Sequence, residues 1–188
     1  MRKMVKSTVL VLFLITIATM AFASADEERS IEFLGFSLDG KLAMVKINDP
    51  NSGNSIEVLS IPKGKKKARA PFYSTAQAKK LVKKFTKRYK IKDKGNNSTQ
   101  DPSGKITFLG LVKGKYFIIL AMRGNRTAVF DKIPAGKASE IKIKEVWWSK
   151  NGRSMTIIIN KKKSDPDYGF DIDTVRLYKY YSSALHFK

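Results

Sequence analysis

The sequence predicts a mainly β protein of the α+β class, in which antiparallel meanders carry one inserted helix. Short apolar stretches alternate with tight turns that end in Gly followed by Lys or Arg, and Gly accepts the positive φ of such turns. One segment instead repeats its apolar residues at helical spacing. The chain contains no Cys, so its stability must come from an ordinary hydrophobic core and not from disulfides.

The first 25 residues are predicted to be a signal peptide. Three basic residues lie within the first six, the run 9–22 is apolar or small, and Ala23-Ser24-Ala25 fits a signal peptidase site. An uncleaved membrane anchor is the alternative, but the apolar run is short for a span of about 20 residues. We therefore expect an exported protein, periplasmic or secreted, with one β-rich domain over 26–188 and no transmembrane helix after signal cleavage.

Three similar units make up most of this domain. Each has an apolar strand, a tight turn and a second β-rich strand, and the Asp39-Gly40 and Asn151-Gly152 dipeptides are strong hairpin signals. The first two units also share an Ile-Pro-x-Gly-Lys segment, and the third ends in an alternating strand over 173–180. Each unit is therefore predicted to be a three-stranded meander. The three strand–turn–strand segments are 33–46, 108–120 and 146–159.

The hairpins at Phe36–Lys41 and Trp148–Arg153 read Phe-Ser-x-Asp-Gly-Lys and Trp-Ser-x-Asn-Gly-Arg, which is similar to blades of β-propellers. Three units are too few for a closed propeller, so we expect an open sheet, a sandwich or an incomplete propeller. Gly35–Lys41 also resembles a family of predicted secreted bacterial proteins of unknown function. In that family a helical insertion follows the first meander, and a segment like Gly169–Asp173 precedes the last strand. The resemblance implies a fold and supplies no catalytic residues.

Residues 63–104 are predicted to be a basic helical excursion followed by a polar loop. Ser74 and Gln77 fit a capping box, and apolar residues then recur at helical spacing up to Tyr89. Residues 63–94 carry a net charge of +13, whereas the other 131 residues of the exported chain carry only +5. Such clustering indicates an anionic partner. The candidate binding residues are Lys79, Lys80, Lys83, Lys84, Lys87, Arg88 and Lys90.

The partner could be an anionic lipid surface, a cell-wall polymer or an acidic protein. The simplest alternative is a helix whose apolar stripe covers the sheet while its lysines are merely solvated. No aromatic residue lies among the outward lysines, so base stacking is not indicated, and export also disfavours nucleic acid. We expect a non-enzymatic binding or envelope-associated protein. A hydrolase acting on an envelope polymer and a structural partner of an acidic envelope protein are the alternatives.

The sequence offers little for catalysis. His186 is the only His, and no phosphate loop, nucleophile elbow or metalloprotease helix is present. Oxygen ligands near Gly169 could hold Ca²⁺, the one cofactor considered, although the bidentate Glu of a helix–loop–helix site is missing and a plain acidic loop is the alternative. Trp147-Trp148 is predicted to be one core and one surface ring, with a carbohydrate platform as the alternative. The candidate metal ligands are Asp165, Asp167, Asp171 and Asp173.

Overall fold

The computed structural model describes residues 27–165 and 168–188, so the predicted signal peptide and Asp167 lie outside the described residues. Within these ranges the chain forms twelve strands, one α-helix and one short 3-10 helix, η1 (Ser182–Ala184). Apart from one short parallel pairing, neighbouring strands are antiparallel. The predicted fold class, mainly β with a helix after the first meander, is confirmed.

The first meander contains four strands instead of the three that the sequence predicts. Residues 66–71 lie inside the segment expected to be helical, yet they pair antiparallel with the third strand. Ala68 and Ala70 pack toward the hydrophobic core, while the Lys and Arg side chains of this strand stay exposed. Charged side chains on an edge strand disfavour pairing with a further strand. The strands are β1 (Glu27–Ser37), β2 (Leu42–Asn48), β3 (Ser55–Ser60) and β4 (Lys66–Pro71).

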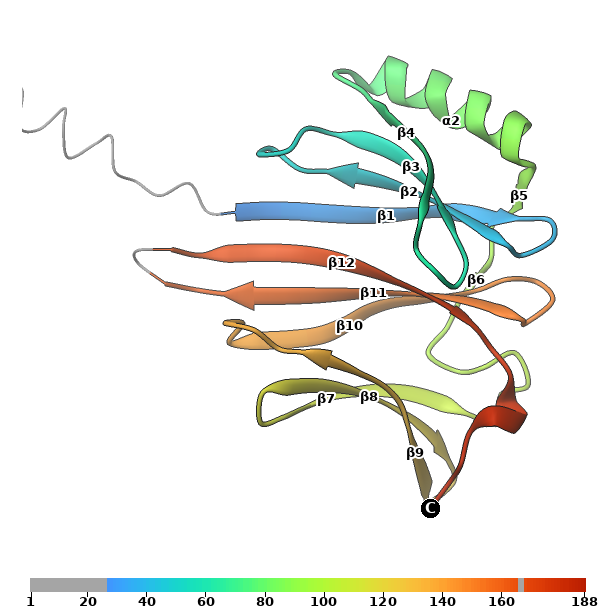
Figure 1. Cartoon of the computed structure of the whole chain (residues 1–188), viewed down its shortest axis with the longest axis vertical. Coiled ribbons are helices and arrows are strands. Elements are labelled where there is room, and N and C mark those ends of the chain that lie inside the picture. Colours follow the sequence, from blue (N-terminus) through green and yellow to red (C-terminus); the bar gives the residue numbers. More distant parts are fainter. Residues whose placement is uncertain (1–26, 166–167) are drawn as a thin grey trace, which may run out of the picture.

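The helix α2 (Thr75–Tyr89) covers the outer face of this sheet (Figure 1). It begins as predicted, because the Ser74 hydroxyl accepts a hydrogen bond from the Gln77 amide at 3.3 Å and the Gln77 side chain accepts one from the Tyr73 amide at 2.8 Å. The predicted apolar stripe packs against residues of β2 and β3 such as Met44 and Val58. The short strands β5 (Ile91–Asp93) and β6 (Asn96–Asn97) then lead away from the helix.

The other two meanders form the rest of the molecule. The second is a separate three-stranded sheet of β7 (Thr107–Lys113), β8 (Tyr116–Arg123) and β9 (Arg126–Pro134). The third consists of β10 (Glu140–Trp148), β11 (Ser154–Lys163) and β12 (Phe170–Lys179). Last in sequence, the third meander is nevertheless the middle layer in space (Figure 1). Its β11 is buried on both faces, since Ile157 and Ile159 face β7–β9 while Ile158 faces β1–β4.

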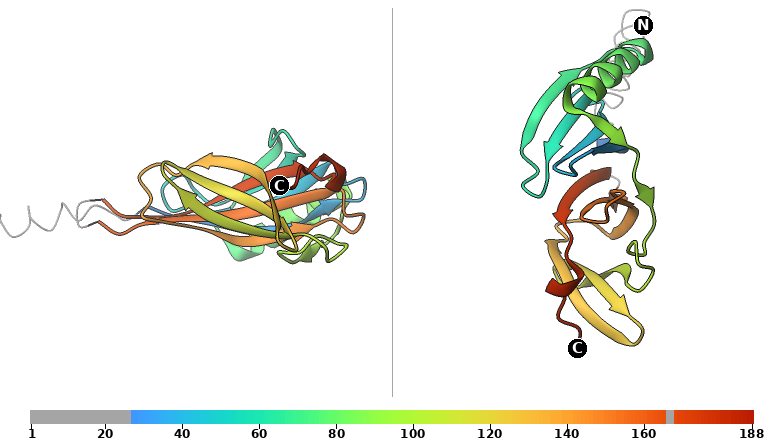
Figure 2. Two further views of the ribbon diagram at one scale, coloured as in Figure 1. Left: turned by 90° about the horizontal axis from the view of Figure 1, so that it is seen from below. Right: turned by 90° about the vertical axis from the view of Figure 1, so that its right-hand side faces the viewer.

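The four layers make an elongated stack in the order α2, β1–β4, β10–β12 and β7–β9 (Figures 1 and 2). The first and middle sheets are joined where Glu27–Arg29 of β1 pairs in parallel with Phe170–Ile172 of β12, and the two strands then diverge. A hydrophobic cluster fills the space between each pair of neighbouring layers. As a result, α2 and β7–β9 lie at opposite ends of the molecule.

The two tryptophans show the effect of this layering. Trp148 is buried in the cluster beneath β7–β9, as predicted for one of the pair. Trp147, expected on the surface, instead stacks on Phe33 with ring centroids 5.0 Å apart and donates a hydrogen bond to Glu145. The surface assignment was wrong because the middle sheet is covered on both sides. Trp147 is therefore a packing residue between two sheets.

Candidate functional site

The basic face of α2 is the largest array of like charge on the first meander. We use this name for the seven predicted residues, and the structure brings all of them to the solvent side of the helix or its end. The opposite side of α2 buries Ala78 and Phe85 against the sheet. Helix packing therefore fixes the array on a rigid support without covering it. The residues are Lys79, Lys80, Lys83, Lys84, Lys87, Arg88 and Lys90.

The cations of this face stand in two rows. Lys79, Lys83 and Lys87 follow one another at intervals of four residues, and Lys80, Lys84 and Arg88 form a parallel row. Like charges at this spacing are neighbours on a helix and repel each other. α2 has no acidic residue, and within the described part of the chain no carboxylate pairs with any residue of the basic face. The face is therefore an uncompensated cluster of positive charge.

The neighbouring strand β4 shows how the same fold neutralises cations elsewhere. Glu57 of β3, itself buried, lies 2.9 Å from the Lys66 ammonium and 3.4 Å from the Arg69 guanidinium. Two cations of the basic excursion are thus part of the sheet's own structure. The charge available to a partner is concentrated on α2 and the residues that directly follow it.

Lys90 ends the helix in an unfavourable backbone conformation. Its φ and ψ are 53° and 40°, and it is the one non-glycine residue with a positive φ among those described. This left-handed position at a helix end usually belongs to Gly or Asn, because a side chain costs energy there. The positive charge of Lys90 is favourable at the C-terminal end of a helix and offsets part of this cost.

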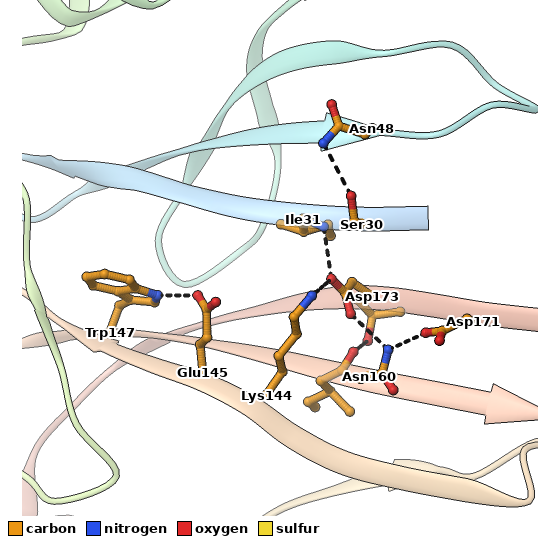
Figure 3. Close-up of polar contacts among 11 residues, drawn as sticks. Ser30, Ile31, Asn48, Lys144, Glu145, Trp147, Asn160, Asp171 and Asp173 are labelled. Carbon is orange, nitrogen blue, oxygen red and sulfur yellow. Dashed lines mark hydrogen bonds and ion pairs between the residues drawn. The ribbon is translucent and has the colours of Figure 1, made fainter. Parts of the chain in front are cut away.

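A second polar site lies where β1 and β12 diverge (Figure 3). The buried Asp173 carboxylate accepts hydrogen bonds from the Ile31 amide at 3.0 Å and from the Lys144 ammonium at 2.6 Å. The Asn160 side-chain amide donates to both Asp171 and Asp173. These contacts border a pocket of about 350 Å³ and fasten the first sheet to the middle one.

The structure brings together only part of the predicted calcium site. Asp171 and Asp173 are neighbours, but their oxygens already accept hydrogen bonds from Asn160 and Lys144. Asp165 lies beside the Lys163 ammonium and lines an adjacent pocket with Asp171. Among the described residues, no three His, Cys, Asp or Glu side chains are grouped so that they could hold one metal ion. Because Asp167 is outside the described residues, the calcium site stays a prediction.

No protein-family model, no curated protein and no solved structure matches this chain. The likeness to propeller blades and to a secreted bacterial family therefore stays a prediction. No helix within the described ranges is long and apolar enough to cross a membrane. Any functional assignment must come from the chain's own geometry.

Sequence reasoning missed two features. The first is the polar cluster of Lys144, Asn160 and Asp173, which come from three different strands. Its only sign in the sequence was the polar Asn160 at the end of an Ile-rich run. A second basic region was also overlooked: residues 105–137 carry a net +6, which the −4 of residues 26–62 hides in the total. A charge sum taken strand by strand would have found it.

Proposed function

We propose that this chain is an exported, non-enzymatic binding protein that holds an anionic partner on the basic face of α2. The observation that carries the proposal is the absence, among the described residues, of any counter-charge for the seven cations. Two rows of repelling like charges weaken a helix, and Lys90 adds backbone strain. A partner that supplies negative charge relieves the repulsion and explains why these residues are present.

The arrangement suits a polyanion better than a single small ligand. Each row spans nine helical residues, so its ends lie about 12 Å apart at 1.5 Å per residue, and all of its side chains are exposed. Lysines act as point charges that do not require one fixed geometry from the partner. A lipid surface, a phosphate- or carboxylate-rich polymer and an acidic protein all meet these requirements. Binding should weaken steeply with salt, because it releases counterions from the partner.

A matched pair of variants tests this proposal. Lys79→Glu, Lys83→Glu and Lys87→Glu together lower the charge of residues 63–94 from +13 to +7. The control changes Lys137, Lys150 and Lys162 to Glu, which alters the net charge equally at exposed positions away from α2. The probe is immobilised heparin, eluted with rising NaCl.

We expect the α2 variant to elute at much lower salt than the parent, and the control variant close to the parent. Circular dichroism should show both variants folded, since surface changes of this kind alter stability by less than about 0.5 kcal/mol each. Equal losses for the two variants would mean that net charge alone governs binding. Unchanged elution of the α2 variant would leave the basic face as a solvated surface without a partner.

A further inference from the structure

The sheet at the other end of the molecule exposes an unusual set of apolar side chains. Strand register places Leu109 opposite Leu120, Leu111 opposite Ile118, and Leu120 opposite Val129. Side chains directly opposite in a sheet share a face, so these five form one continuous surface, which we call the apolar face. Leu109, Leu111 and Val129 are 46%, 39% and 63% exposed. Their strand neighbours, such as Phe108 and Ile119, point the other way into the core.

The apolar face is uncovered, in contrast to the same surface of the first meander. There, α2 packs over the outer side of the sheet and hides residues such as Met44 and Val58. No described element lies beyond β7–β9, which ends the stack opposite α2 (Figures 1 and 2). Clustered exposure of large aliphatic side chains at one place marks an interaction surface.

One end of the apolar face is positively charged. Lys113 lies opposite Tyr116 on this face, and Lys115 lies in the turn between them. At the other end, Arg123 and Arg126 are paired on the core side of the sheet, where the Arg123 guanidinium lies 4.6 Å from the centroid of the Phe187 ring. Asp131, the one acidic residue of these strands, turns inward and accepts a hydrogen bond from Tyr178. Beside the aliphatic residues, the Tyr116 ring lies under the Lys132 ammonium at 3.9 Å and near that of Lys115 at 5.6 Å. The surface is thus aliphatic in the centre, and aromatic and basic at one end.

We propose that the apolar face docks on the surface of an anionic lipid bilayer. Aliphatic side chains can enter the acyl boundary while the basic end contacts acidic headgroups, and Tyr is favoured at that depth. A second copy of the chain fits less well, because a symmetric dimer pairs this face with itself and so brings no acidic residue to its lysines. A peptide helix would prefer a groove, whereas the best-formed pockets of the described residues are lined by other side chains.

This inference does not rest on the basic face of α2, which points away from β7–β9. The two surfaces should also differ in their response to salt. Contacts of exposed lysines are screened over about 8–10 Å at physiological salt, but burial of aliphatic groups is not. A chain with both activities should bring two anionic vesicles together, one at each end.

The test uses vesicles of phosphatidylglycerol and phosphatidylcholine with protein purified after export, every variant carrying the same N-terminus. Leu109→Thr, Leu111→Thr and Val129→Thr remove the aliphatic groups but keep residues that suit a strand. The control, Leu38→Thr with Tyr181→Thr, changes exposed apolar residues that lie elsewhere. Each set is made in the parent and in the Lys79, Lys83 and Lys87→Glu background, and binding is measured by cosedimentation at low and high NaCl.

We expect the α2 variant to keep salt-resistant binding, and the added threonines to weaken it at least about tenfold. The parent and the control variant in the parent background should cluster vesicles, as read from turbidity, and the other variants should not. Full salt-resistant binding by the threonine variant would overturn the inference, and so would a complete loss of binding in the α2 variant alone. A concentration-dependent dimer that the threonines abolish, without vesicle binding, would assign the face to a second copy. Loss of low-salt binding in the threonine variant with α2 intact would support the inference and exclude a lipid surface as the partner of the basic face of α2.

Discussion

Lys90 carries a cost that a single substitution should reveal. We expect Lys90→Gly to raise the free energy of unfolding by about 0.5 kcal/mol, since relief of the left-handed backbone exceeds the entropy that Gly adds to the unfolded chain. Urea denaturation measures this gain, and heparin elution should move to lower salt because one charge is lost. Lys92→Gly, in the adjacent strand β5, is the control and should be destabilising. A less stable Lys90→Gly variant would show that the Lys90 side chain holds the helix end.

Tyr178 gives the protein a dependence on alkaline pH. Burial, together with the hydrogen bond to Asp131 and its negative charge, raises the pKa of Tyr178 above its ordinary value of 10.0. A raised pKa in the folded state means that this stabilisation is complete below pH about 10 and is lost as the pH rises toward the folded pKa. We expect the free energy of unfolding to fall with pH more steeply in the parent than in Tyr178→Phe.

Urea denaturation between about pH 9 and pH 11 measures both slopes. Deprotonation of the lysines affects the parent and the variant alike, so it cancels in the comparison. Tyr180, whose pKa burial and Asp101 also raise, is likewise common to both proteins. Parallel slopes would mean that the Tyr178 phenol is ionised as easily in the folded protein as in the unfolded chain.

For the helix as an element, the two rows of cations predict an effect of salt on stability. Four like-charged pairs at a spacing of four residues cost roughly 1 kcal/mol together at low ionic strength. Screening by about 0.5 M NaCl should therefore raise the melting temperature by about 2–4 °C. The variant Lys79→Gln, Lys83→Gln and Lys87→Gln should show a smaller rise in melting temperature with salt. The control variant, with glutamines at positions 137, 150 and 162, should show the same rise as the parent. An identical rise in all three proteins would contradict the repulsion.

The elements that the sequence predicted correctly are those with local signals. The Ser74–Gln77 cap and the Asp39-Gly40 turn involve residues within a few positions of each other, and both are observed. β4 was missed because Lys66–Pro71 is held extended by pairing with β3 and by contacts to Glu57, which the local sequence does not show. The apolar face was missed for a similar reason: Leu109 and Leu111 resemble core residues until the register shows which side of the sheet they occupy.

For the whole chain, residues 1–25 are predicted to be removed during export. The hydrophobic clusters of the described residues draw on Ile31 to Phe187, so cleavage after Ala25 leaves these clusters intact. N-terminal sequencing of exported protein should begin at Asp26. A membrane-bound product that still begins at Met1 would make this an anchored protein.

The place of the third meander in the stack has a consequence for the order of folding. Residues 140–179 supply the layer on which both other sheets pack, yet a ribosome makes them last. Until they appear, Phe33 and Val45 on one sheet, like Phe117 on the other, lack the surface that buries them in the finished protein. Contacts between such distant segments form slowly and late. We therefore expect the growing polypeptide to lack its final packing until the third meander is made, a state that suits the export predicted from residues 1–25.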